Sequence, residues 1–210
     1  EQLGIYLQDQ INILDNLILV AGLRYSAVDQ DSIDPVSGQE TNRYDDALTP
    51  RIGIVYQPVD AISLYASYSR SFVANLETDA QGSPLDPEEG EGFEIGIQGE
   101  IIENRLAAIL AYFDITKQNV ATADPNDPFA SVAVGEQRSR GIDFSLSGEI
   151  LPGWNIIASY AYIDAEVTKD NTDIEGNRLF GIPEHSASLW TTYELQSGHL
   201  QGLGFGFGFN

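Results

Sequence analysis

Residues 92–101 read Gly-Phe-Glu-Ile-Gly-Ile-Gln-Gly-Glu-Ile, and this stretch decides the fold class. Phenylalanine or isoleucine holds four of the five odd positions from 93 to 101, and every even position is glycine or polar. Successive side chains of a strand point to opposite faces, so a period of two predicts a β-strand with one apolar face. The same alternation recurs at 142–150 and 203–209. We therefore expect an all-β, antiparallel fold.

Extending this pattern along the 210 residues predicts ten strands. Most reach the length of about 9–11 residues that a tilted strand needs to cross a bilayer. No run of about 18 apolar residues exists, so a transmembrane helix is not expected. The predicted strands are 4–12, 16–28, 48–58, 61–71, 92–102, 105–118, 136–150, 154–165, 185–195 and 200–210. Segments 105–117 and 185–195 carry apolar residues on both faces, which leaves their outward side open.

The connections between these strands alternate between short and long. In an up-and-down meander every second connection lies at the same edge, so all long loops gather at one edge and all tight turns at the other. Outer-membrane barrels have this arrangement, with short periplasmic turns and long external loops, whereas a soluble β-sandwich has no reason to sort its loops. The tight turns are expected at Asp15-Asn16, Val59-Asp60, Glu103-Asn104, 151–153 and Ser197-Gly198, and the long loops at 29–47, 72–91, 119–135 and 166–184.

The distribution of charge supports the same arrangement. The chain has a net charge of −22 and only ten Lys and Arg residues, which excludes a nucleic-acid partner. Four segments that include the long loops hold 20 of the 32 acidic residues, and Arg43, Lys169 and Arg178 are their only basic residues. Charges on the lipid-facing side cost several kcal/mol within hydrocarbon, so acids gathered at one rim suit a membrane barrel. The absence of cysteine excludes disulfides, thiolate metal sites and cysteine catalysis in this chain.

The direction of the strands predicts an incomplete barrel. The first predicted strand runs into a tight turn and the last runs out of one, which leaves Glu1 and Asn210 both at the external edge. An open sheet in lipid would leave unpaired backbone groups at both of its edges. We therefore expect at least one further strand on each side, so that residues 1–210 form part of one larger barrel domain.

Several strings resemble the barrel of TonB-dependent ferric-siderophore receptors, in particular the ferrichrome and ferric-hydroxamate branch. The resemblance extends over most of the chain. It rests on Leu3–Gln10, Leu48–Pro58 and Ser63–Phe72, and most specifically on Leu85–Gly96, Phe113–Asn119, Gly135–Ile142, Pro152–Asn155 and Pro183–Ser186.

This resemblance implies a monomeric outer-membrane receptor of a Gram-negative bacterium, with a barrel of about 22 strands and a plugged lumen. Its implied function is the uptake of a ferric siderophore, energised by the TonB-ExbB-ExbD system. Outer-membrane lipid would surround the barrel. The plug domain, the TonB box and the final strands of such a receptor are not in this sequence. The chain is thus expected to be about ten strands of the barrel, without a second domain. Iron would travel as the siderophore chelate, so no resident cofactor or metal site is expected.

Charged residues on the strands are predicted to face the lumen. Glu136, Arg138 and Arg140 share one face at a period of two, and charges facing a plugged lumen usually pair with one another or with the plug. A structural role is therefore favoured over a siderophore contact. Arg51, Arg70 and Glu94 receive the same interpretation, as does Glu100.

Four aromatic residues in or beside the external loops are candidate ligand contacts: Tyr44, Phe72, Phe129 and Phe180. Their rings can pack against an organic chelate, although packing within the loops is the favoured explanation for each of them. Trp154, Tyr160, Tyr162 and Tyr193 are instead expected in the aromatic girdles at the membrane interfaces. The acidic strings at 29–34 and 124–127 offer oxygens to adventitious Ca²⁺ but lack the ordered spacing of an EF-hand loop.

Two other classes of outer-membrane barrel remain as alternatives. A passive porin would share the strands and loops but lack a plug. A rim enzyme would need a catalytic set, and the chain has only His185 and His199, with neither an H-E-x-x-H nor a G-x-S-x-G motif. A receptor without enzymatic activity is therefore the expectation.

Overall fold

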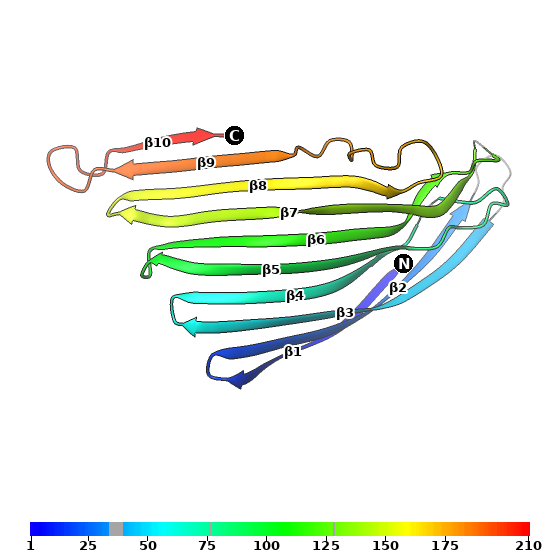
Figure 1. Cartoon of the computed structure of the whole chain (residues 1–210), viewed down its shortest axis with the longest axis horizontal. Coiled ribbons are helices and arrows are strands. Elements are labelled where there is room, and N and C mark those ends of the chain that lie inside the picture. The colour runs from blue at the N-terminus through cyan, green and yellow to red at the C-terminus, as the bar shows by residue number, and fades with distance from the viewer. Residues whose placement is uncertain (34–39, 76, 128) are drawn as a thin grey trace.

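The computed structural model describes residues 1–33, 40–75, 77–127 and 129–210. Its strands form one antiparallel sheet of ten strands, in which the spatial order follows the sequence order from β1 to β10 (Figure 1). The predicted all-β fold and its ten-strand meander are confirmed. The described residues contain no helix long and apolar enough to cross a membrane.

The strands differ widely in length. β6 and β7 have 18 and 21 residues, whereas β10 at the sheet edge has six. The bounds are β1 Gln2–Leu14, β2 Leu17–Ile33, β3 Glu40–Val59, β4 Ile62–Val73, β5 Glu88–Ile102, β6 Leu106–Ala123, β7 Ser131–Leu151, β8 Trp154–Lys169, β9 His185–Glu194 and β10 Gly204–Phe209.

Several strands extend beyond their predicted ends at the long-loop edge. β2 continues to Ile33 and β3 begins at Glu40, so much of the predicted loop 29–47 is strand, while its segment 34–39 lies outside the described residues. β7 likewise begins at Ser131, five residues before the predicted start. On β2 and β3 the hydrogen-bonded ladder continues there although most side chains on both faces have become polar, whereas the extension of β7 keeps Val132 and Val134. The apolar alternation that revealed the strands therefore ends before the strands do.

The connection between β9 and β10 corrects a second prediction. Instead of a tight turn at Ser197-Gly198, residues 195–203 form a longer connection. The Leu195 amide donates to the Leu203 carbonyl at 3.0 Å, and the Gly202 amide donates to the Leu195 carbonyl at 2.9 Å. The other four tight turns lie where the sequence predicts them. The sorting of connections to opposite edges is therefore confirmed.

Local chemistry accounts for two of the tight turns. Gly153, between β7 and β8, has a φ of 82°, a left-handed conformation that glycine adopts without a steric penalty. Its amide donates to Glu149 Oε1 at 2.8 Å. Asn104, between β5 and β6, has a φ of 54°, and asparagine is among the few other residues that tolerate this region. These residues allow the chain to reverse within a few positions.

The pairing register gives the sheet one face that is apolar over its middle. Across β2 to β7, one row of directly paired residues is Leu19, Ile54, Ala66, Ile95, Tyr112 and Ile142. Most of these side chains are large, apolar and exposed, as expected for a surface that meets lipid. The register also places Leu110 of β6 and Leu189 of β9 on this face, which settles the side that the sequence left open.

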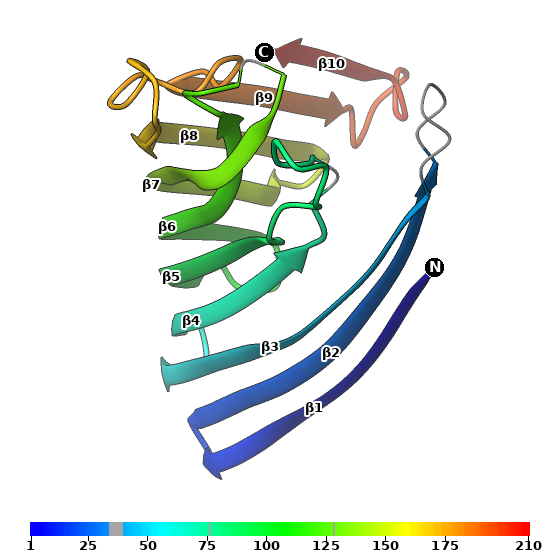
Figure 2. The same cartoon turned by 90° about the vertical axis from the view of Figure 1, so that its right-hand side faces the viewer.

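The sheet is strongly curved, and the loop between β4 and β5 lies inside the curve (Figure 2). Arg43, which alternates with the apolar-face residue Tyr44 on β3, donates through Nη1 to the Leu85 carbonyl of this loop. The loop therefore covers the face opposite to the apolar one. We call the apolar, convex side the outward face and the opposite side the concave face.

Candidate ligand entry site

The β4–β5 loop crosses the concave face at the long-loop edge. On one side it is held by Arg43, which also pairs with Asp45 at 2.5 Å. The side chains of this ion pair are only 14% and 10% exposed, so the pair is largely withdrawn from water. The Asn75 side chain is buried at the start of the loop and accepts a hydrogen bond from the Glu77 amide at 3.1 Å. The loop thus has a fixed attachment to β3.

Two further hydrogen bonds hold the same loop to the opposite side of the curve. The Ser131 amide at the start of β7 donates to the Thr78 carbonyl at 3.1 Å. The Asn119 side chain on β6 donates to the Pro87 carbonyl at 2.9 Å. The loop is therefore attached to β3, β6 and β7, and it narrows the mouth of the concave space.

The β8–β9 loop is joined to this rim as well. Asn171 donates to the Ala123 carbonyl at 2.9 Å, which links the loop to the end of β6. Arg178 pairs with Glu184 within the loop and donates to the Ile163 carbonyl at 3.1 Å. The external rim is therefore a connected network of loops.

Two of the four predicted ligand-contact aromatics project from this rim. Phe129 lies in the β6–β7 loop and Phe180 in the β8–β9 loop, with relative exposures of 98% and 104%. A fully exposed phenylalanine gains no burial from its own fold, so packing within the loop does not explain either ring. Both rings are available to contact a bound molecule.

The other two aromatics lie within strands and face outward. Tyr44 and Phe72 belong to β3 and β4 rather than to loops, and the register puts both on the outward face. The Tyr44 hydroxyl lies 3.0 Å from that of Tyr25, its neighbour on the same face. Tyr44 therefore lies within a strand that extends into the predicted loop, whereas Phe72, one residue before the end of β4, lies beside the β4–β5 loop as predicted.

Of the seven predicted lumen-facing charges, Arg51, Glu94 and Glu100 lie on the concave face. Arg51 and Glu94 line a shallow hollow of about 410 Å³ with Tyr65, Ser67 and Gln98. These three were not predicted from the sequence: Gln98 shares its parity with Glu94 on β5, whereas Tyr65 and Ser67 alternate with the outward Arg70 on β4. Val20 and Val55 also line the hollow, so polar and apolar side chains both face the interior of the curve.

The other four charges face outward, and the prediction that they line the lumen is wrong. The register places Arg70 and the Glu136, Arg138 and Arg140 set on the face of Ile142 and Phe144. They stand nearer the long-loop edge than the apolar belt, where an outward side chain no longer needs to meet hydrocarbon. The shared even numbering of the β7 charges with Ile142 and Phe144 already indicated this placement.

Ion pairs compensate these outward charges. Arg138 binds Asp114 in a bidentate manner, at 2.8 and 2.5 Å. Arg140 pairs with Asp164 at 3.0 Å. Glu136 accepts hydrogen bonds from Lys169 at 2.8 Å and from Thr168 at 2.9 Å. All three charges therefore pair within the sheet, on the outward face rather than the predicted one.

No cluster of three or more His, Asp or Glu side chains able to hold a metal ion occurs in the described part of the chain. The Asp124 and Asp127 carboxylates accept hydrogen bonds from the backbone amides of Asn126 and Phe129, at 2.8 and 3.0 Å. Asp34 of the other acidic string lies outside the described residues. The carboxylates at 124–127 therefore serve the conformation of their own loop.

The histidine near the rim has no catalytic arrangement. Nδ1 of His185 lies 2.9 Å from the Tyr160 hydroxyl, and its ring lies 5.3 Å from that of Tyr162. All three residues are on the outward face, whereas Ser186 alternates to the concave face. The side chains of a Ser-His pair are thus separated by the sheet.

Comparisons with known proteins identify the family. The family model described as "TonB dependent receptor-like, beta-barrel" matches residues 1–210. The metal–pseudopaline receptor of Pseudomonas aeruginosa is 39% identical over 219 residues, covering 100% of this chain and 30% of the relative. The ferrichrome outer membrane transporter and phage receptor of Escherichia coli is 35% identical over 208 residues, covering 99% of this chain and 28% of the relative.

A solved structure agrees with the fold. The alcaligin outer-membrane receptor of Bordetella pertussis superposes with a TM-score of 0.83 at 30% identity, covering 99% of this chain and 36% of that receptor. The chain thus spans only about a third of the length of these proteins. They are receptors and transporters, which confirms the prediction that the chain is not an enzyme. The chain belongs to the β-barrel family of TonB-dependent receptors, which are proteins of the Gram-negative outer membrane.

Proposed function

We propose that the receptor containing this chain takes up a ferric siderophore across the outer membrane, with energy supplied through TonB, ExbB and ExbD. The observation that supports this proposal most strongly is the match of all 210 residues to the barrel of TonB-dependent receptors. A concave wall that carries Arg51 and Glu94, and a mouth narrowed by the β4–β5 loop, support it. TonB would contact a part of the receptor outside these residues, and the receptor would act as a monomer.

The proposed cargo is a hydroxamate-type chelate, with iron as its substrate metal and no resident cofactor. The similarity to the ferrichrome transporter supports this class. The metal–pseudopaline receptor is also similar, so a chelate of a different type is the competing cargo. The proposal assigns Phe129 and Phe180 to the chelate, because both rings project fully exposed from the rim. It assigns Arg51 and Glu94 to the wall around the plug.

Transport of radiolabelled iron in whole cells tests this proposal. A strain lacking the gene should lose uptake of ferric ferrichrome or ferric ferrioxamine B, and the complete gene should restore it. Uptake should also require TonB and a membrane potential. Uptake that persists without TonB would favour a passive porin. If the complete gene restores uptake of metal–pseudopaline but not of the hydroxamate chelates, the hydroxamate assignment is wrong.

Phenylalanine substitutions at the mouth test the ligand contacts. Phe129→Ala and Phe180→Ala should each weaken chelate binding about 2- to 10-fold, as expected for the loss of one aromatic contact. Tyr44→Ala is the matched control, because this exposed ring lies on the outward face and should leave binding unchanged. Equal binding by all three variants in an equilibrium fluorescence titration would remove both rings from the site.

A further inference from the structure

One acidic residue of the outward face stands within the apolar belt. The outward charges on β4 and β7 lie nearer the long-loop edge than the apolar residues of their strands. Asp9 on β1 differs from them, because apolar outward residues lie on both sides of it along the strand. From the long-loop edge to the tight turn, the outward residues of β1 are Leu3, Ile5, Leu7, Asp9, Ile11 and Ile13.

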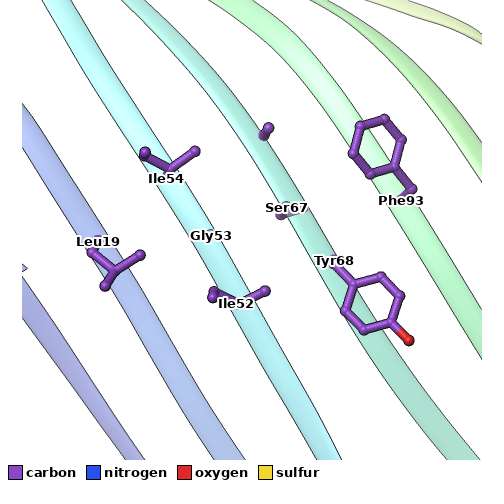
Figure 3. A pocket seen from close by; sticks show the side chains of 8 residues that line it. Leu19, Ile52, Gly53, Ile54, Ser67, Tyr68 and Phe93 are labelled. Atoms are coloured by element: carbon purple, nitrogen blue, oxygen red, sulfur yellow. The ribbon is translucent and has the colours of Figure 1, made fainter.

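The neighbouring strands surround this carboxylate with apolar side chains. Asp9 pairs with Ala21 of β2, and Ala21 pairs with Ile52 of β3. Its diagonal neighbours on β2 are Leu19 and Leu23, which pair with the apolar residues before and after Asp9. Figure 3 shows Leu19 and Ile52 on this face, with only aliphatic carbon at their ends. The outward neighbours on β2 and β3 therefore give the carboxylate no cationic partner.

The Asp9 carboxylate is turned toward the free edge of β1. Glu1 and Asp29 exchange backbone hydrogen bonds, so the odd-numbered residues of β1 up to Ile11 bond to β2, and the even-numbered amides point away from it. The Gln10 amide, which therefore points to the free edge, donates to Asp9 Oδ1 at 2.9 Å. The carboxylate thus lies on the side where this chain supplies no neighbouring strand.

Closure of the barrel would remove this hydrogen bond. A strand beside β1 takes the Gln10 amide into its ladder, because a backbone amide in hydrocarbon needs a carbonyl partner. The Asp9 carboxylate then needs another donor, since an uncompensated charge in hydrocarbon is costly. Ionisable side chains in membrane spans pair with one another for this reason. A basic side chain on the outward face of the neighbouring strand meets the requirement.

We propose that the strand at the free edge of β1 carries a lysine, arginine or histidine on its outward face, and that this side chain pairs with Asp9 inside the apolar belt. The partner is a segment of the complete receptor outside these 210 residues, and the relatives are about three times as long as this chain. The pair joins the two strands through side chains in addition to the backbone ladder. The inference concerns barrel closure and is independent of the cargo.

Urea unfolding of the complete receptor in lipid vesicles tests the pair. Asp9→Asn removes the charge at nearly constant shape, and Asp9→Leu replaces it with an apolar side chain. Both variants leave the basic partner uncompensated in hydrocarbon, so both should raise the equilibrium constant for unfolding at least about tenfold. A carboxylate without a partner predicts the opposite for Asp9→Leu, because an apolar side chain in the belt then stabilises the barrel.

Asp15→Asn is the matched control, because Asp15 lies exposed in the tight turn of the same hairpin. It should leave the unfolding constant within about twofold of the wild type. Asp9→Lys should destabilise the receptor, and replacement of the facing basic residue by aspartate should restore most of the loss. Heat-modifiable migration in gels checks that each variant is folded.

Two results would overturn the proposal. One is an Asp9→Leu receptor that is as stable as the wild type or more stable. The other is a complete sequence with no basic residue at the outward position facing Asp9, which requires no folded variant. Neither result depends on siderophore uptake, so this proposal and the proposed function fail separately.

Discussion

The two halves of β7 share one strand and one face but differ in chemistry. Every second residue of β7 lies on the outward face, and in order these residues are Arg138, Arg140, Ile142, Phe144 and Leu146. Toward the tight turn this face carries aliphatic and aromatic side chains, and toward the long loop it carries ions paired across the sheet. The orientation of the side chain is constant, so the medium that it meets must change along the strand.

This difference shows how far the membrane extends along the sheet. In hydrocarbon an outward charge is expensive, whereas beyond it water and neighbouring acids compensate the same charge. The transition on β7 falls between Arg140 and Ile142. On β4 the corresponding change falls between Ala66 and Arg70, with the amphipathic Tyr68 between them.

A charge moved into the apolar half should have the largest effect. Leu110→Arg places a cation in the middle of the apolar belt on β6 and should cost about 2–4 kcal/mol of stability in a bilayer. Thr116→Arg, on the same strand and face but beside Glu91, should cost less than about 1 kcal/mol. Urea unfolding of the complete receptor in lipid vesicles measures both. Equal costs would show that the two halves meet the same medium.

The Arg43–Asp45 ion pair on the concave face extends the comparison, because its side chains are more buried than those of the ion pairs on the outward face. Arg43→Ala leaves Asp45 without its partner and frees the Leu85 carbonyl, at a local cost of about 1–3 kcal/mol. Hydrogen exchange should accelerate in residues 77–87 of the β4–β5 loop. Arg178→Ala, which breaks an exposed pair in another loop, is the control and should leave exchange at 77–87 unchanged.

The outward ion pairs should show the smallest effect. Their side chains are partly exposed, so solvent screens the attraction, and the coupling between Asp114 and Arg138 should be below about 1 kcal/mol. A double-mutant cycle of Asp114→Ala and Arg138→Ala in vesicle unfolding measures it. The coupling should fall further as salt is added. A large coupling, insensitive to salt, would indicate that the pair is shielded from water.

The fold was largely predictable from sequence because the lipid-facing belt imposes a strict apolar alternation. Phe93, Ile95 and Ile97 reveal β5 on this basis alone. The strand ends were not predictable, because residues such as Asp29 and Arg43 continue the ladder with polar groups on both faces. The longer β9–β10 connection was missed because Gly198 marks one turn within it rather than the whole reversal.

The site was less predictable, because its parts meet through loops that cross the concave face. Nothing near Arg43 in sequence indicates a contact with Leu85, which lies 42 residues away. The four outward charges were misplaced by the assumption that a charge on a membrane strand must face the lumen. On β7 the charged residues have even numbers, as Ile142 does, so their outward placement could have been predicted from the sequence. The pairing of Arg70 with Glu91 could not, because it depends on how β4 and β5 are aligned.

Cysteine scanning along β7 tests the boundary most directly, since the chain has no cysteine of its own. Single variants Arg138→Cys, Arg140→Cys, Ile142→Cys and Phe144→Cys, in cells carrying the complete receptor, are exposed to a membrane-impermeant maleimide. Labelling should be rapid at 138 and 140 and slow at 142 and 144, although all four positions share one face. Equally slow labelling at all four would place the arginines inside the membrane and contradict the boundary, as would equally rapid labelling.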